Sequence, residues 1–276
     1  MNMNWFQSLF YGLISGFTEF MPISSRAHQD VLLSIFGCSE HDPIRNFIVH
    51  ITALFVLISV CKDLFSQLHR EKHARGHHTR GLRNTQTTYF ARLVRSATLP
   101  LTVSMILISY AYKGDLNLLS AAAFLLINGI VLYIPCRMLQ GNKDAQSMSV
   151  FDSWIIGLSG AFSVISGISR IGSSISVSLI RGADKKNALN WALALSVPAL
   201  LVLIGVDFLG IIFADSPFRF WNNFLNYLLT LVGAGFGSYL SIRLIRFITN
   251  RVNYIGFAYY SWGMSLFAFI LYLVIV

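Results

Sequence analysis

The chain has 276 residues, of which 55% are hydrophobic and 12% are charged, and its formal net charge is +9. A soluble globular domain carries roughly 25% charged residues, so the composition excludes an ordinary soluble enzyme and a disordered or nucleic-acid-binding chain. We therefore expect an all-α integral membrane protein whose surroundings are the bilayer and whose partners include no nucleic acid.

Long apolar runs predict six membrane-spanning helices of about twenty residues each. They lie at 46–61, 91–111, 117–137, 187–213, 220–247 and 254–276. Two further apolar segments, 5–37 and 152–182, are interrupted in their middles by Pro, Gly and Ser residues. Irregular backbone at membrane depth is tolerated only where it is buried in protein or lines a wet cavity. Each segment is therefore predicted to be a re-entrant helix pair that enters and leaves on one side.

Lysine and arginine residues are distributed unevenly over the loops of this topology. The loops on one side carry Arg45, Lys113 and Arg219, whereas those on the other side carry fourteen basic residues. The fourteen are Lys62, Arg70, Lys72, Arg75, Arg80, Arg83, Arg137, Lys143, Arg181, Lys185, Lys186, Arg243, Arg246 and Arg251. Because cytoplasmic loops are enriched in basic residues, we expect the rich side to be cytoplasmic and both termini to lie outside.

The basic loop 62–89 also contains four histidines, His69, His73, His77 and His78. No Cys or carboxylate cluster completes a metal-ligand set there. We therefore interpret the loop as a solvated basic segment near anionic headgroups rather than as a metal site.

Each half of the chain contains one re-entrant segment followed by three spans. An odd number of crossings turns the second copy upside down relative to the first, which is an inverted-topology repeat. Two short matches are separated by the same 144 residues: Ser15-Gly16 with Ser159-Gly160, and Ser25-Arg26 with Ser169-Arg170. We therefore expect a single membrane domain, 1–276, that consists of a first repeat at 5–138 and a second repeat at 152–276.

The two breaks are predicted to place helix N-termini near the membrane midplane. Pro22 suits the first turn of a helix, so 22–36 is expected to form the second half-helix of the first pair, with 168–181 as its counterpart. Free N–H groups and the positive ends of two helix dipoles collect anions, phosphate above all. The hydroxyl side chains expected to bind substrate there are Ser24, Ser25, Ser169, Ser173 and Ser174.

Four ionisable residues complete the candidate site. Arg26 and Arg170 can each bind phosphate oxygens through a planar guanidinium group. Glu19 lies in an apolar run, where an ionisable residue indicates function, although a Glu–Arg pair that only joins the repeats is the alternative. His28 follows Ser24 by one helical turn and is a candidate acid or base near neutral pH.

Three further polar residues within the apolar segments are interpreted as structural. Asp30 is placed to pair with Arg26 across one helical turn. Asp207 and His50 lie inside predicted spans, and we expect each of them to be a packing or pairing residue rather than a catalyst.

At these residues the chain resembles the undecaprenyl-pyrophosphate phosphatase family of the BacA/UppP type. The family's first signature, approximately (E/Q)GxTEFLP(I/V)SSxGH, is similar to the stretch SGFTEFMPISSRAH that ends at His28. Its second signature, approximately PGxSRSGxT, is similar to SGISRIGSS at 166–174. The stretch HITAL at His50 looks like the family's HLGTL, and FAYY at Phe257 looks like its C-terminal FAxY.

The resemblance implies a phosphatase of bacterial envelope and peptidoglycan synthesis, with a link to bacitracin resistance. It would sit in the plasma (inner) membrane, with its active site on the outer side, and remove the terminal phosphate of a C55 polyprenyl diphosphate. A divalent cation, Mg²⁺ or Ca²⁺, would assist, and Glu19 would carry that metal or position the water. Ser25 would be the nucleophile with His28 as its acid/base partner, or His28 would activate water directly. A homodimer is left open.

Several positions depart from the family's pattern. The first acid of the (E/Q)xxxE pair is Ser15, and Arg26 stands where the family has Thr. In the second signature Ser166 replaces Pro and Ile171 replaces Ser. Fewer carboxylates and one more cation both weaken metal binding, so we expect a weak metal requirement. Two rival functions are a flippase for polyprenyl phosphate or another anionic lipid, and a small-anion or drug permease.

Overall fold

The computed structural model describes residues 3–38, 41–66, 85–112, 117–139, 141–213, 223–249 and 254–275. Its helices are α1 (Trp5–Glu19), α2 (Ser25–Ile35), α3 (Pro43–Val60), α5 (Thr85–Ala111), α6 (Leu118–Arg137), α7 (Val150–Ala161), η2 (Phe162–Val164), α8 (Arg170–Ile180), α9 (Lys185–Ile212), α11 (Phe224–Thr249) and α12 (Ile255–Ile275). Across these described ranges there is no β-strand, and the expected all-α class is confirmed. The histidines of loop 62–89 lie outside the described residues.

Within the described ranges, six helices are long and apolar enough to cross a bilayer: α3, α5 from Tyr89 onward, α6, α9, α11 and α12. The six predicted spans are thus confirmed, with somewhat different ends. For example, α3 begins at Pro43 because the Asp42 side chain accepts a hydrogen bond from the backbone N–H of Ile44 and Pro43 occupies the first turn. Large apolar side chains such as Phe55 and Leu107 remain 73% and 63% exposed, which is favourable only in a lipid environment.

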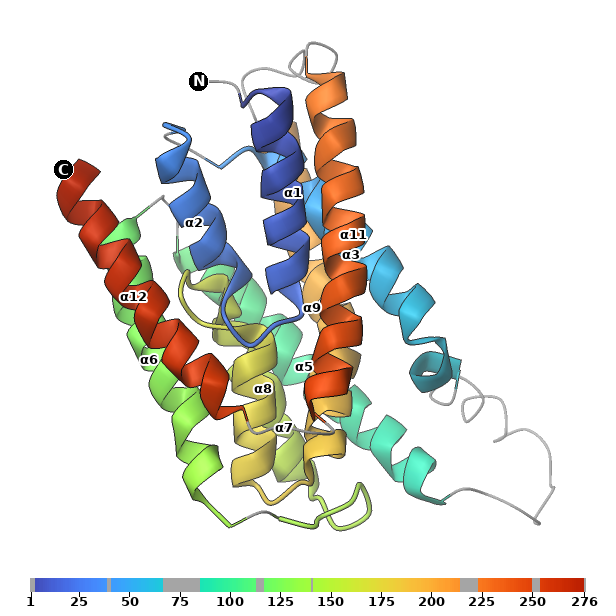
Figure 1. Ribbon diagram of the computed structural model, residues 1–276. Coiled ribbons are helices and arrows are strands. Elements are labelled where there is room, and N and C mark those ends of the chain that lie inside the picture. The colour runs from blue at the N-terminus through green and yellow to red at the C-terminus, as the bar shows by residue number, and fades with distance from the viewer. Residues whose placement is uncertain are drawn as a thin grey trace.

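The two interrupted segments form helix pairs that are too short to span a bilayer. Helices α1 and α2 have 15 and 11 residues, and α7 and α8 have 12 and 11, against the roughly 20 that a span needs. In Figure 1, α1 and α2 occupy the upper half of the molecule and α7 and α8 the lower half, with the connecting turns near mid-height. The chain therefore turns back twice inside the protein, once from each end.

The start of α2 differs from the prediction. Pro22 lies in the turn rather than in the helix, and α2 begins at Ser25, with Ser24 as its N-cap. The N-cap of α8 is Ser169. Both half-helices therefore begin with a serine cap, and the first of them begins three residues later than the proline suggested.

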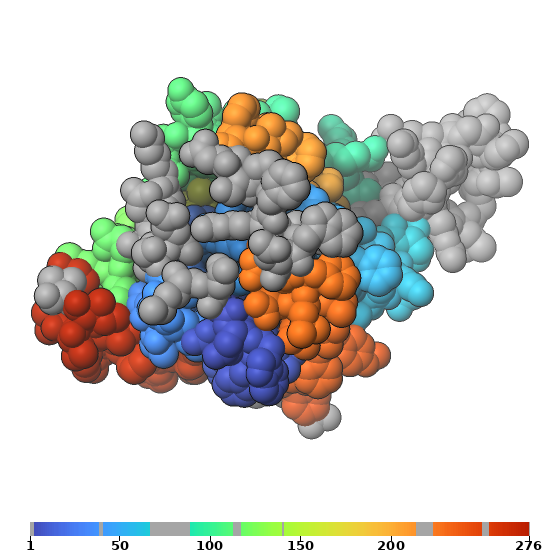
Figure 2. Space-filling view, turned by 90° about the horizontal axis from the view of Figure 1, so that it is seen from above, coloured from blue at the N-terminus to red at the C-terminus, as the bar shows by residue number. Residues whose placement is uncertain are grey.

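Helices of the two halves pack against each other in matching pairs. Helix α1 packs on α11, and α7 packs on α5; α6 packs on α12 and α3 on α9. The contact of α1 with α11 is also visible from the upper end, where the two helices lie side by side (Figure 2). A Cβ atom on Gly16 would lie 2.2 Å from the Ala234 carbonyl oxygen, and one on Gly157 would lie 2.2 Å from the Ala97 carbonyl oxygen. Small residues thus let the helix backbones approach closely in both halves of the chain.

Candidate active site

The two turns interlock through hydrogen bonds between a serine of one and a backbone group of the other. The backbone N–H of Gly167 donates to Ser24 Oγ at 3.1 Å, and Ser169 Oγ donates to the carbonyl oxygen of Met21 at 3.1 Å. Both serines also cap their own helices, since Ser24 Oγ accepts from Ala27 N–H and Ser169 Oγ accepts from the amide that follows it by three residues. These hydroxyls therefore fix the turns in place, and each is committed to the protein.

A buried asparagine from α6 joins the same two turns. The Asn128 side-chain amide donates to the Pro22 carbonyl oxygen at 3.1 Å and to Ser261 Oγ at 3.0 Å. Its Oδ1 accepts from the backbone N–H of Ser169 at 3.0 Å. Sequence reasoning missed Asn128, although a fully apolar neighbourhood around a single amide in a predicted span was the available signal.

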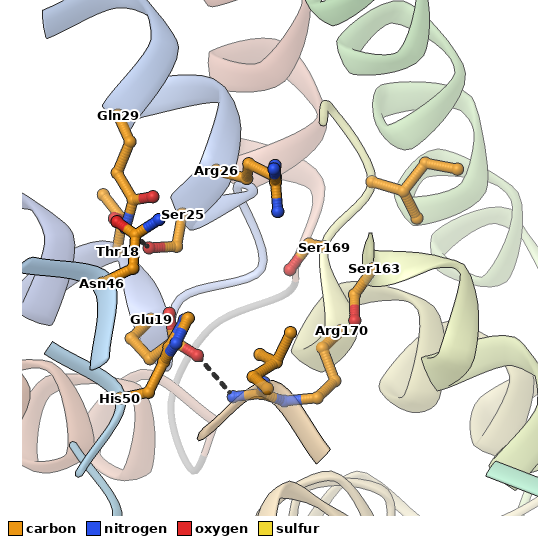
Figure 3. Close-up of a pocket in the computed structure, with 12 residues that line it drawn as sticks. Thr18, Glu19, Ser25, Arg26, Gln29, Asn46, His50, Ser163, Ser169 and Arg170 are labelled. Atoms are coloured by element: carbon orange, nitrogen blue, oxygen red, sulfur yellow. Dashed lines mark hydrogen bonds and ion pairs between the residues drawn. The ribbon is translucent and has the colours of Figure 1, made fainter. Parts of the chain in front are cut away.

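A pocket of about 40 Å³ lies where the two turns meet. It is large enough for ordered water, and its walls come from both halves of the chain (Figure 3). Its lining consists of Thr18, Glu19, Ser25, Arg26, Gln29, Asn46, His50, Ser163, Ile168, Ser169, Arg170 and Leu203. Five of the residues predicted from the sequence are therefore brought together here: Glu19, Ser25, Arg26, Ser169 and Arg170.

An ion pair between the repeats forms one wall of the pocket. Arg170 Nη2 donates to Glu19 Oε1 at 2.8 Å, and both side chains are only 5% exposed (Figure 3). Arg170 Nε donates to Ser196 Oγ at 3.3 Å. Because the guanidinium is held by a carboxylate and a hydroxyl, its position at the pocket is fixed before any ligand binds.

Ser25 and Arg26 approach the pocket from the first turn of α2. Ser25 Oγ donates to the Ser15 carbonyl oxygen at 3.1 Å and accepts from Gln29 Nε2 at 3.4 Å. The Arg26 guanidinium points into the space between α2 and the second turn, toward Ser169 (Figure 3). Two guanidinium groups and one carboxylate thus face a common cavity, so the site favours an anion.

Asp30 lies on the same helix as Arg26, and its carboxylate is hydrogen-bonded to Ser166 in the second turn. Its carboxylate accepts from His41 Nε2 at 2.6 Å and from Ser166 Oγ. Ser166, which stands where the family's signature has Pro, therefore contributes a hydrogen bond that a proline could not donate.

His28 lies outside the pocket lining, with both ring nitrogens engaged. Nδ1 lies 2.8 Å from the Ser24 carbonyl oxygen, and Nε2 lies 2.7 Å from Tyr260 Oη, with the two rings stacked. Since a carbonyl oxygen only accepts, Nδ1 carries the proton of the neutral ring and Nε2 accepts from the tyrosine. The structure does not bring His28 to Ser25. Two other predicted residues, Ser173 and Ser174, are buried in α8 outside the lining.

Seven residues of the lining were not predicted as part of the site, and two of them are polar residues of α3. His50 of α3 lines the pocket, and its Nδ1 lies 2.6 Å from Asp207 Oδ2 of α9. Asn46, one turn earlier on α3, accepts a hydrogen bond from Tyr11 Oη at 3.1 Å. Both are polar residues inside an apolar helix, and that was the signal that pointed to them.

The donor set of the pocket does not fit a resident divalent cation. Glu19 is the single carboxylate of the lining, and it is paired with Arg170. Mg²⁺ and Ca²⁺ prefer several oxygen ligands with a net negative charge, whereas two guanidinium groups face this space. Among the described residues no group of three or more His, Cys, Asp or Glu side chains could hold a metal.

Comparison with known proteins gives a match over nearly the whole chain. The profile of a family described as bacitracin resistance protein BacA matches residues 8–267, which include every residue of the pocket lining. The chain is 26% identical to an undecaprenyl-diphosphatase of Halothermothrix orenii over 271 residues, or 98% of each chain. It is 28% identical to one of Alkaliphilus metalliredigens over 282 positions, which cover 95% of this chain and 97% of the relative. It is 24% identical to one of Carboxydothermus hydrogenoformans over 94% of each chain.

Proposed function

The chain belongs to the bacitracin resistance protein BacA family, and we propose that it hydrolyses undecaprenyl diphosphate to the monophosphate lipid and inorganic phosphate. The observation that carries this proposal is the pocket between the two turns, where Arg26 and Arg170 face one cavity beside the start of α2. The relatives named above are undecaprenyl-diphosphatases over the same length of chain. This enzyme is a membrane-embedded phosphoric anhydride hydrolase.

The two arginines supply the charge that the reaction needs. The terminal phosphoryl group gains its stabilisation from donors that are already in place, which is the largest contribution that a protein makes to phosphoryl transfer. Arg170 is fixed by Glu19 and Ser196, and Arg26 approaches the same cavity from the opposite turn. Together they can hold the phosphate oxygens from two sides and offset the charge that passes to the bridging oxygen as the P–O bond breaks.

Water is the nucleophile that this arrangement supports better than Ser25. The Ser25 hydroxyl is within hydrogen-bond reach of the Ser15 carbonyl oxygen and of the Glu19 carboxylate. Its expected base, His28, is committed to Ser24 and Tyr260. Ser25 then binds the attacking water, because its oxygen can accept a hydrogen bond from that water. No step passes through a metal ion, and we propose that Arg26 supplies charge that a cation would otherwise provide.

We further propose that the end that carries both termini in Figure 1 lies on the outer side of the bacterial plasma membrane. The opposite end carries the described basic residues Arg137, Lys143, Arg181, Lys185 and Lys186 at helix ends and in the connections between helices. Such an excess favours the cytoplasmic side. An impermeant thiol reagent applied from outside should label Asn117→Cys and not Gln146→Cys, each in a Cys136→Ser background. Labelling of Gln146→Cys without labelling of Asn117→Cys would show that the orientation is the reverse of the proposed one.

The proposed activity is tested by phosphate release from purified protein in detergent, with undecaprenyl diphosphate as substrate. We expect inorganic phosphate and undecaprenyl monophosphate in equal amounts. The matched control is Arg170→Gln, which removes the fixed guanidinium and should lower turnover at least about 100-fold. Lack of phosphate release by a folded wild-type protein would contradict hydrolysis and leave transport of the lipid as the surviving candidate.

A further inference from the structure

A second histidine lies on the wall of the pocket with a carboxylate behind it. His50 projects from α3, and its Nδ1 lies 2.6 Å from Asp207 Oδ2 on α9. The two side chains are 11% and 13% exposed. Because the ionised carboxylate accepts and cannot donate, Nδ1 of a neutral imidazole carries the proton and Nε2 is an acceptor. This is the tautomer that a general base requires.

His28, His41 and His50 each have a hydrogen-bond partner, but they differ in whether they line the pocket. His28 has both nitrogens engaged by Ser24 and Tyr260, and it lies outside the pocket lining. His41 pairs with Asp30, also away from the pocket. His50 lines the pocket itself, and Nδ1 makes its one hydrogen bond within the described part of the chain. His50 is therefore the histidine that can reach a molecule in the cavity.

Glu19, the other candidate base, is occupied. Its carboxylate accepts from Arg170, so a proton taken up by Glu19 would break the ion pair that fixes the phosphate-binding guanidinium. His50 lies beside Glu19 in the pocket wall (Figure 3), where the charged neighbours are the carboxylates of Glu19 and Asp207 and the guanidinium of Arg170. In the pocket, phosphate binding therefore depends on Arg170 and its partner Glu19, whereas proton transfer can use His50.

We infer that His50 is the general base of the hydrolysis and that Asp207 is its positioning residue. The inference rests on the proposed function. Oxygen of the attacking water forms a bond to the terminal phosphorus, and its proton passes to His50 Nε2. The bridging P–O bond breaks, and its electron pair leaves on the undecaprenyl monophosphate. Asp207 holds the ring in the productive tautomer and offsets the positive charge of the imidazolium. His50 then returns the proton to solvent.

A carboxylate inside a spanning helix supports this reading. An ionisable residue at membrane depth is costly, and such residues face the protein interior and mark reaction or transport paths. Asp207 sits on α9 among exposed apolar residues such as Val206 and Phe208, which are 40% and 52% exposed, yet its own side chain turns to His50. The alternative is a pair that only joins α3 to α9, and kinetics separate the two roles.

The experiment compares phosphate release and substrate affinity in four variants. His50→Gln should lower kcat at least about 100-fold and change KM less than about threefold. Asp207→Asn should lower kcat about tenfold, and Asp207→Glu should recover most of it, because a carboxylate rather than an amide is needed. His41→Gln is the matched control, since it breaks a histidine–aspartate pair outside the pocket, and it should retain kcat within about threefold.

A rescue measurement keeps the test decisive if His50→Gln folds poorly. Imidazole added to folded His50→Gly should restore phosphate release, whereas a merely structural pair would gain nothing from a free base. A kcat of His50→Gln within about threefold of the wild type, or no rescue of folded His50→Gly, would overturn the inference and leave the proposed function standing. A wild type that releases no phosphate would overturn both.

Discussion

The two re-entrant turns lie at corresponding places in the two halves of the chain and differ in their chemistry. Ser25-Arg26 and Ser169-Arg170 are 144 residues apart and supply a hydroxyl and a guanidinium from each copy. Glu19 is matched by Ser163 at the same separation. The first copy therefore contributes the carboxylate, and the second contributes the arginine that this carboxylate holds. The two halves of the chain thus contribute different groups to one pocket, although their helices pack in matching pairs.

The backbone conformations of the two turns also differ. Ser24 adopts φ 65°, a left-handed conformation that costs a non-glycine residue about 1 kcal/mol or more. Gly167 in the other turn has φ 104°, and a Cβ atom there would lie 2.4 Å from Phe124 Cβ. The first turn thus accommodates a side chain that caps α2 and receives Gly167 N–H, whereas the second turn has no room for one.

The strongest test of the difference between the two turns is to neutralise the carboxylate of Glu19. Glu19→Gln should lower turnover at least about 100-fold, because Arg170 loses the charge that holds it at the pocket. Ser163→Ala at the matched position should stay within about threefold, since Ser163 Oγ has no hydrogen-bond partner in the described part of the chain. Phosphate release by folded protein measures both. Equal losses would mean that the copies contribute alike.

Backbone substitutions at the turns test the second difference. Gly167→Ala should lower the free energy of unfolding by about 2 kcal/mol or more, from left-handed strain together with the contact at Phe124. Ser24→Gly should lower it by about 1 kcal/mol, because relief of strain offsets the lost cap but the Gly167 N–H loses its acceptor. Chemical unfolding in mixed micelles reports both values. A stable Gly167→Ala protein would show that the turn is looser than the structure describes.

The arginines of the two copies should also differ. Arg170→Lys keeps the charge and loses the planar fork that reaches Glu19 and Ser196, so we expect about a tenfold loss of turnover, or about 1.4 kcal/mol. Arg26→Lys removes the same fork from the half-buried arginine and should cost less than half of that free energy. Steady-state kinetics on undecaprenyl diphosphate decides, and unchanged turnover in Arg170→Lys would exclude a role for its fork.

The smallest expected effect concerns metal ions. Arg26→Thr should lower turnover about threefold and make the remainder depend on added Mg²⁺, since one source of positive charge is lost. Wild-type activity should persist in a chelator. A chelator titration of both proteins measures this, and complete loss of wild-type activity with no effect of Arg26→Thr would contradict the charge-replacement account.

The sequence predicted the spans and the breaks because both follow from local signals: apolar runs of sufficient length, and Pro, Gly and Ser residues inside them. The motifs also predicted five residues of the pocket lining, but they placed His28 in the site and left His50 out of it. His28 follows Ser25 by three residues, yet its ring packs on Tyr260 of α12, a contact between residues 232 apart in the chain. Helix periodicity places a residue on a face and leaves the rotation of that helix against its neighbours undetermined.

The pair of His50 and Asp207 shows the same limit. The two residues are 157 positions apart, on helices whose relative rotation no local pattern specifies. Each was interpreted from the sequence as a packing or pairing residue. Pairing is confirmed by the 2.6 Å contact. The position of His50 in the pocket lining could not be predicted from the apolar periodicity of its helix.

The most direct test of the account is the position of the phosphates in a complex with a methylene analogue of undecaprenyl diphosphate, which resists hydrolysis. We predict that the terminal phosphonate lies in the pocket between the two turns. Its oxygens should be within about 3 Å of guanidinium nitrogens of both Arg26 and Arg170. A phosphonate bound elsewhere, or contacted by only one of the two arginines, would contradict a site built jointly by both copies.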